Sequence, residues 1–227
     1  MTSTAAWDPA RTGKTVVFWR HGRTEWNRAG RFQGQQDIAL DPSGVHQAVA
    51  AAAVLRHLHP DVIVSSDLSR ALATGQALAD ATGKPISTDP RLRETYAGSW
   101  EGLFFADIAQ RFPQEQAGWA AGNGEVRAGG GESRVDVGRR VAQAVTEAAD
   151  AMAPGGTLVV VSHGGAIRAG ICALLGLPTE SWTVISGVSN SHWSVLEERD
   201  TAAGGSRWNL AQHNVGLASL PSGPLEG

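Results

Sequence analysis

The stretch that decides the fold is TVVFWRHG, residues 15–22. An apolar, β-branched run of this length is typical of a buried strand in a parallel sheet. Ligands of open α/β sheets bind at the carboxyl ends of the strands, so Arg20 and His21 are expected beside a ligand crevice. Gly22 allows a sharp turn and leaves room next to the backbone. On its own, the stretch fits a basic surface turn behind a core strand equally well.

Two further segments have the same construction. The segment TLVVVSHGG, residues 157–165, places His163 directly after a predicted strand. The segment DVIVSSDLSR, residues 61–70, places Arg70 shortly after another. Because parallel strands end at the same edge of a sheet, we expect these side chains to meet Arg20 and His21 in one cationic pocket.

Helical patterns separate these strands. Capping signals and apolar spacing predict helices over residues 45–58, 69–82, 103–112, 133–152 and 164–175, and Pro113 is expected to end the third. Alternating residues predict an antiparallel hairpin from 192–198 and 207–212. The alternation predicts an α/β fold, a three-layer α/β/α sandwich with a mainly parallel central sheet. We expect a single domain over residues 14–215, a flexible arm at 1–13, a flexible tail at 216–227, and a lid or linker in the glycine-rich stretch 118–131.

The composition limits the classes of function. The 227 residues carry a net charge of −3, so no overall basic field favours nucleic acid or anionic lipid as a partner. The single cysteine excludes an internal disulfide and suits a reducing compartment. No signal-like segment and no membrane-length apolar run is present, which predicts a cytoplasmic protein without a membrane partner. The apolar strand ends and the hairpin suggest a homodimer.

The predicted pocket suits a phosphoryl group. A guanidinium fork matches a tetrahedral oxyanion, and the first turns of the helices behind Gly22 and Gly164 would add backbone N–H donors. No H-E-x-x-H or C-x-x-C motif is present, so we expect neither a metal nor a cofactor. A small phosphate ester is therefore the expected partner.

Without a metal, hydrolysis of such an ester requires a nucleophile. A neutral nitrogen of His21 would attack phosphorus and form a phosphohistidine, while an acceptor such as a backbone carbonyl holds the other ring nitrogen. Arg20, Arg70 and His163 would stabilise the charge of the transition state.

The leaving oxygen requires a proton donor. The charged loop at residues 89–101 offers Glu94, with Glu101 and Glu25 as rivals. Spacing alone fits an ordinary salt bridge from Glu94 to Arg91 or Arg93 equally well.

Five motifs resemble the histidine phosphatase superfamily, in its phosphoglycerate mutase-like branch. They are RHGRTEWN at 20–27, SSDLSRA at 65–71, LRE at 92–94, GSWEG at 98–102 and SHGG at 162–165, in the family's order. The resemblance implies that His21 is phosphorylated, that Arg20, Arg70 and His163 bind the phosphate, and that Glu94 donates the proton. It also implies phosphate or substrate contacts from Thr24, Asn27, Gln33 and Gly164.

Within that family, residues 91–102 resemble the phosphatases rather than the mutases. The segment GGGESRVDV at 129–137 is similar to the actinobacterial glucosyl-3-phosphoglycerate phosphatases. The sequence therefore predicts a metal-independent phosphoric monoester hydrolase acting on a small phosphorylated metabolite, such as glucosyl-3-phosphoglycerate or another sugar or glycerate phosphate. The alternatives are a phosphoglycerate mutase and, more remotely, a non-catalytic phosphate-binding module.

Overall fold

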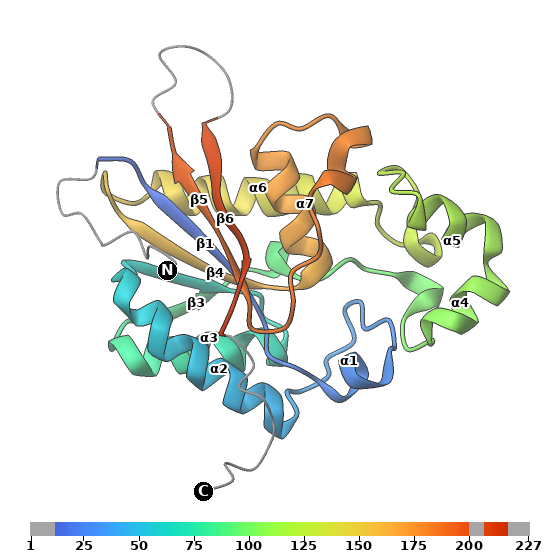
Figure 1. The fold of residues 1–227 in the computed structure, drawn as a ribbon, viewed down its shortest axis with the longest axis horizontal. Helices are drawn as coiled ribbons and strands as arrows, with labels where there is room; N and C mark the ends of the chain where they lie inside the picture. Colours follow the sequence, from blue (N-terminus) through green and yellow to red (C-terminus); the bar gives the residue numbers. More distant parts are fainter. Residues whose placement is uncertain (1–11, 200–206, 218–227) are drawn as a thin grey trace, which may run out of the picture.

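The computed structural model describes residues 12–199 and 207–217, and these contain a six-stranded sheet (Figure 1). The strand order is β3-β2-β4-β1-β5-β6. Strands β1 to β4 pair in parallel, whereas β5 is antiparallel to β1 and β6 is antiparallel to β5. The mainly parallel sheet and the C-terminal hairpin are thus confirmed. The strands are β1 (Thr15–Arg20), β2 (Val62–Ser65), β3 (Ile86–Thr88), β4 (Thr157–Ser162), β5 (Trp193–Glu198) and β6 (Trp208–Val215).

Helices cover both faces of this sheet. Helices α2 (Pro42–Leu55) and α3 (Ser69–Thr82) lie on one face, and α6 (Arg134–Asp150) and α7 (Gly164–Leu174) lie on the other (Figure 1). Alternate residues of β1 supply the two interfaces, because successive side chains of a strand point to opposite faces. Val16 and Phe18 pack with α6 and α7, while Val17 and Trp19 pack with α2 and α3. The predicted three-layer sandwich is therefore confirmed.

Local signals place the helix ends near their predicted positions. Asp41 caps α2 by accepting a hydrogen bond from the Gly44 N–H, and Pro42 occupies the first helical turn. Ser133 begins α6 with a reciprocal capping box to Asp136. Gly83 ends α3 in the left-handed region, at φ 69°.

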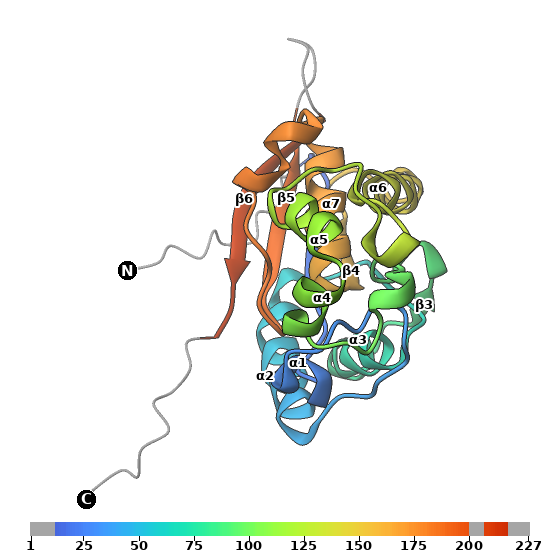
Figure 2. The same ribbon diagram turned by 90° about the vertical axis from the view of Figure 1, so that its right-hand side faces the viewer.

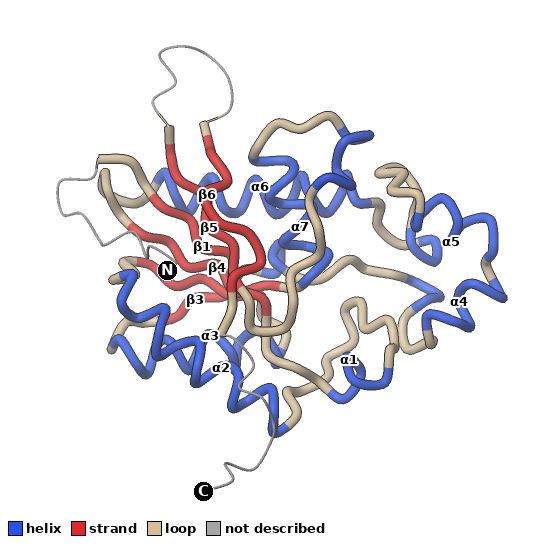
Figure 3. The backbone as a smooth tube through the Cα atoms, viewed as in Figure 1, coloured by secondary structure: helices blue, strands red, loops and turns tan. Residues whose placement is uncertain are grey.

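The segment after β3 agrees with the prediction only in part. The predicted helix is α4 (Phe105–Arg111), and it ends just before Pro113 as expected. A second helix that the sequence did not predict, α5 (Pro113–Ala120), begins at this proline, because proline fits the first turn of a helix. Both helices lie to one side of the sheet in Figure 3 and face the viewer in Figure 2. They cover a small apolar cluster around Trp100. The stretch 118–131, expected to be a lid or linker, packs there through the fully buried Ala128.

The sheet brings the predicted functional segments together at one edge. Arg20, at the end of β1, pairs with Ser162, at the end of β4, and Ser65 of β2 pairs with Val161. The His21 N–H donates to the Ser162 carbonyl at 3.0 Å. The predicted arm and tail lie mostly outside the described residues. Within those residues, no helix combines the length and the apolar character needed to span a bilayer.

Candidate active site

His21 lies where β1 leaves the sheet, and its side chain is almost fully buried. Its Nδ1 lies 2.7 Å from the carbonyl oxygen of Gly22. A carbonyl only accepts, so Nδ1 carries the proton and Nε2 keeps a free lone pair. Burial, with the positive charges of Arg20 and Arg70, lowers the pKa of His21 well below its usual value. The ring is therefore a neutral imidazole at physiological pH, as nucleophilic attack requires.

Arg70 comes from the first turn of α3 and is fully buried. Its Nη1 donates to the Gln36 carbonyl at 2.7 Å and its Nη2 to the Gly34 carbonyl at 2.8 Å. Burial lowers the pKa of Arg70 to about 10, so the guanidinium still carries its charge at neutral pH. The two carbonyls hold the side chain in place and leave one N–H on each terminal nitrogen for a ligand.

His163 follows β4, and its ring centroid lies 5.1 Å from that of His21. Its Nδ1 accepts a hydrogen bond from Arg70 Nε at 3.2 Å, so its Nε2 carries the proton and donates to Ser66 Oγ at 2.9 Å. Burial, then the charge of Arg70, lowers the pKa of His163 well below its usual value. The ring does not line the cavity. In this geometry His163 holds Arg70 and packs against His21.

Arg20 contributes a second guanidinium to the same cavity. Its Nη1 donates to the Val188 carbonyl at 2.6 Å, whereas its buried Nε has no hydrogen-bond partner among the described residues. A buried donor without a partner is costly, so such a group marks a place where a ligand oxygen is expected. A side chain at Gly164 would begin 3.3 Å from this guanidinium, which explains the glycine there.

Glu94 reaches the cavity from the loop before α4, and backbone amides fix its carboxylate. Oε1 accepts from the N–H of Thr95 and of Ala166, both at 2.9 Å, and Oε2 accepts from the Gly165 N–H at 3.0 Å. The Gly165 and Ala166 amides at the start of α7 therefore bind Glu94 and not a phosphate. A phosphate contact from the Gly164 N–H stays a prediction.

The alternative partners and rivals of Glu94 are engaged elsewhere. Arg91 pairs with Asp89 and Glu147, and Arg93 pairs with Asp67, so the salt-bridge interpretation of Glu94 is wrong. The two rival acids also have structural partners. Glu25 pairs with Arg28 at the surface, and Glu101 accepts backbone N–H bonds from Gln35 and Ala97.

Two amide side chains line the cavity beside His21. Asn27 Oδ1 accepts from the Thr24 N–H and from Asn190 Nδ2, each at 3.1 Å. Gln33 Oε1 accepts from the Thr24 hydroxyl at 3.0 Å. Both oxygens are thereby used, and both NH₂ groups are left as donors. Thr24, expected to contact substrate, is fully buried and does not line the cavity; it orients Asn27 and Gln33 instead.

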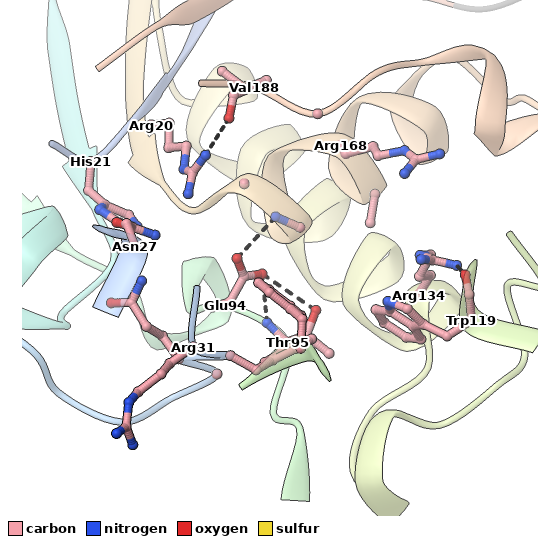
Figure 4. A pocket seen from close by; sticks show the side chains of 18 of the residues that line it. Arg20, His21, Asn27, Arg31, Glu94, Thr95, Trp119, Arg134, Arg168 and Val188 are labelled. Atoms are coloured by element: carbon pink, nitrogen blue, oxygen red, sulfur yellow. Dashed lines mark hydrogen bonds between the residues drawn. The ribbon is translucent and has the colours of Figure 1, made fainter. Parts of the chain in front are cut away.

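The cavity has a volume of about 320 Å³ and extends well beyond these groups. Figure 4 shows Arg20, His21 and Asn27 on one side, Glu94 in the middle, and Arg134, Arg168 and Trp119 on the other. Sequence reasoning did not assign the residues of this second side. The spacing of Gly164 and Arg168, one helical turn apart, is a signal that would have suggested one of them. Trp119 comes from the α5 segment, which the sequence did not predict as a helix.

Another residue without a predicted role holds the Glu94 loop. Arg140 Nη1 donates to the Arg91 and Arg93 carbonyls, both at 2.7 Å, and its Nη2 donates to the Glu94 carbonyl at 2.9 Å. Its Nε bonds Glu132 at 2.8 Å. In the described residues, no group of three or more His, Cys, Asp or Glu side chains is arranged to hold a metal ion.

Comparison with known proteins decides the family. The model of the histidine phosphatase superfamily (branch 1) matches residues 16–211. The chain belongs to this superfamily. As a histidine phosphatase it is a phosphomonoesterase, and the resemblance stated from the motifs is confirmed.

Three relatives indicate the range of substrates in this family. The chain is 43% identical over 214 residues to the glucosyl-3-phosphoglycerate phosphatase of Mycolicibacterium vanbaalenii, covering 89% of this chain and 95% of the relative. It is 34% identical to phosphoserine phosphatase 1 of Hydrogenobacter thermophilus over 187 residues, covering 81% and 87% of the two chains. The structure of a mycobacterial glucosyl-3-phosphoglycerate phosphatase complexed with VO3 matches with a TM-score of 0.82, 40% identity, and coverage of 88% and 98%.

Proposed function

We propose that this histidine phosphatase hydrolyses a small phosphorylated metabolite through a phosphohistidine on His21. One observation carries the proposal: two guanidinium groups and a neutral imidazole with a free Nε2 line one cavity. Arg20, one of these two groups, also has a buried Nε without a partner among the described residues. A tetrahedral phosphate dianion supplies the acceptors and the negative charge that this arrangement lacks.

In the first half of the reaction, Arg20 and Arg70 bind the phosphate oxygens, and Asn27 and Gln33 donate to them through their NH₂ groups. The Nε2 lone pair of His21 attacks phosphorus as the bond to the ester oxygen breaks. Glu94 gives a proton to the leaving oxygen, which departs as an alcohol. His163 acts by holding Arg70 against the developing charge.

The second half regenerates the enzyme. Water attacks the phosphohistidine, Glu94 takes the proton from that water, and the bond from phosphorus to Nε2 breaks. Inorganic phosphate leaves, and His21 is again a neutral imidazole. Neither half needs a metal or a cofactor, because the guanidinium groups supply the positive charge.

Glucosyl-3-phosphoglycerate is the first candidate substrate, supported by the 43% identity to a phosphatase of that name. Phosphoserine and other glycerate or sugar phosphates follow. A cytoplasmic location is supported by the single cysteine, which suits a reducing compartment. The homodimer stays a prediction, which light scattering of the purified protein tests.

The test is phosphate release from a panel of sugar phosphates, phosphoglycerates and phospho-amino acids in excess EDTA. We expect turnover in the wild type, inhibition by vanadate, and loss of turnover in His21→Ala. Full activity in His21→Ala would refute the assignment of the nucleophile. Interconversion of 2- and 3-phosphoglycerate without net phosphate release would identify a mutase instead, and phosphate binding without turnover would indicate a binding module.

A further inference from the structure

The cavity has a second cationic region, away from His21. Arg134 is the first residue of α6 and Arg168 lies in the second turn of α7, and both line the cavity. Figure 4 places them on the opposite side of the pocket from His21, with Glu94 between. The reaction derived above uses neither residue.

Both guanidinium groups are held in place by backbone carbonyls. Arg134 Nη1 donates to the Trp119 carbonyl at 2.8 Å, and its Cζ lies 3.8 Å from the centroid of the Trp119 ring. Arg168 donates to the Trp182 carbonyl from Nε at 3.3 Å and from Nη2 at 3.0 Å. These bonds fix the orientation of each group, and its other N–H donors have no acceptor in the part of the chain that the structure describes.

The two arginines differ from most others in their ion pairs. Within residues 12–199 and 207–217, no ion pair joins Arg134 or Arg168 to a carboxylate. Asp136, two residues along from Arg134, pairs with Arg127 and Arg139 instead. Burial, and then the charge of Arg168, lower the pKa of Arg134 to about 10, so Arg134 is still cationic at neutral pH. Two such charges close together are unfavourable in the empty enzyme and become favourable when an anion binds between them.

We propose that Arg134 and Arg168 form a second anion subsite that binds a carboxylate of the substrate while the phosphate occupies the His21 pocket. The inference rests on the proposed function, because it requires the phosphate to lie beside His21. Trp119 adds an aromatic wall on this side and Phe105 adds a further aromatic lining residue to the cavity, so the carbon skeleton of the substrate has apolar surface to pack against. The preferred substrates are therefore phosphate monoesters that also carry a carboxylate.

The subsite is assigned to a carboxylate and not to a second phosphate. A carboxylate has about four acceptor positions, and one bidentate guanidinium on each side satisfies them. A substrate with two phosphates, the bisphosphate of 1,3-propanediol, serves as the test of this choice.

The experiment compares substrates that differ only by the carboxylate. Phosphoserine is paired with phosphoethanolamine, and 3-phosphoglycerate with 2-hydroxyethyl phosphate. We expect the wild type to prefer the carboxylated member of each pair. In Arg134→Gln and in Arg168→Gln, kcat/KM for that member should fall about 10- to 100-fold, the range of one charge-assisted hydrogen bond. For the member without the carboxylate it should stay within about twofold.

Matched variants separate recognition from folding. Arg139→Gln makes the same change on an exposed position of α6 outside the cavity and should leave both members of each pair unchanged. Arg134→Lys and Arg168→Lys keep the positive charge, so they should keep part of the preference for the carboxylated ester that the Gln variants lose. Thermal unfolding checks that each variant folds.

Three outcomes would contradict the proposed carboxylate subsite without contradicting the proposed phosphatase activity. They are equal rates for both members of each pair in the wild type, equal losses for both members in the variants, and a preference for the bisphosphate over the carboxylated esters. Failure of the wild type to release phosphate from any of these esters would instead contradict the proposed function.

Discussion

The substitution Gly165→Ala tests whether the position of Glu94 controls protonation of the leaving group. A Cβ at residue 165 would lie 2.6 Å from Glu94 Oε1 and 3.3 Å from its Cδ. An ordinary carbon–oxygen contact requires about 3.4 Å, so the carboxylate or the start of α7 must move by about 0.8 Å. The hydrogen bonds that hold Glu94 from the Gly165 and Ala166 amides would then be disturbed.

The size of the effect depends on the leaving group. A misplacement near 1 Å costs about 100-fold in rate, and general acid catalysis as a whole contributes about 10²- to 10⁴-fold. We therefore expect kcat/KM for an alkyl phosphate to fall about 100-fold in Gly165→Ala. For p-nitrophenyl phosphate, whose leaving group departs without a proton, the loss should be only a few-fold. The parameter kcat/KM is the appropriate one because it includes only the steps up to formation of the phosphoenzyme.

The assay is initial-rate phosphate release from both esters by the wild type and each variant. Glu94→Gln should reproduce the same dependence on the leaving group. Gly187→Ala is the matched control, because it adds the same methyl group at the cavity wall where no atom lies within 4 Å, and should change either rate less than about twofold. Equal losses for the two esters in Gly165→Ala, or no loss for either, would refute the assignment of Glu94 as the proton donor.

Three further predictions follow from the contacts around the site. Arg140→Lys should lower the free energy of unfolding by about 3 kcal/mol, and it should reduce kcat more than it raises KM. The same change at the exposed Arg139 should alter neither the stability nor the kinetics. Equal behaviour of the two variants in urea titrations and kinetic assays would contradict this prediction. The pKa values of His21 and His163 are lowered in the folded state, so below a pH of about 6.5 the unfolded state binds more protons than the folded state. The free energy of unfolding should therefore fall as the pH drops below that value, by up to about 2.7 kcal/mol per pH unit for the two rings together. Urea midpoints measured from pH 7.5 to 5 give this slope, and His163→Asn should roughly halve it. A stability that does not change over this pH range would contradict the burial of two neutral rings. Arg20→Lys removes the unpartnered Nε donor and should weaken vanadate inhibition about tenfold or more, and an unchanged inhibition constant would show that this donor does not meet the anion.

The sheet and the inner pocket are predictable from the sequence because they depend on local patterns. The run at residues 15–19 alternates between two faces that are both buried, so its apolar character alone indicates a central strand. Three such strands in parallel bring Arg20, Arg70 and His163 to one edge without any knowledge of side-chain contacts. Ser133 predicts the start of α6, where it forms a capping box with Asp136.

Other features depend on tertiary contacts that local patterns do not contain. Glu94 and Glu101 are the same residue type in one loop, and only the backbone amides that each meets distinguish them. Thr24 sits in the first motif beside residues that line the cavity, yet its hydroxyl faces Gln33. Trp119 becomes part of the cavity only because α5 packs against the apolar cluster around Trp100. On the second side of the pocket, only Arg168 has a sequence signal, through its spacing from Gly164; the other residues there depend on tertiary packing.

Direct detection of the phosphoenzyme is the measurement that tests the account most closely. Glu94→Gln, which should slow hydrolysis of the intermediate, is mixed with substrate, quenched in alkali to preserve phosphohistidine, digested and mapped by mass spectrometry. We expect one phosphoryl group on His21, and none when His21→Ala is added to the same variant. A phosphoryl group on any other residue, or full turnover by His21→Ala, would contradict it.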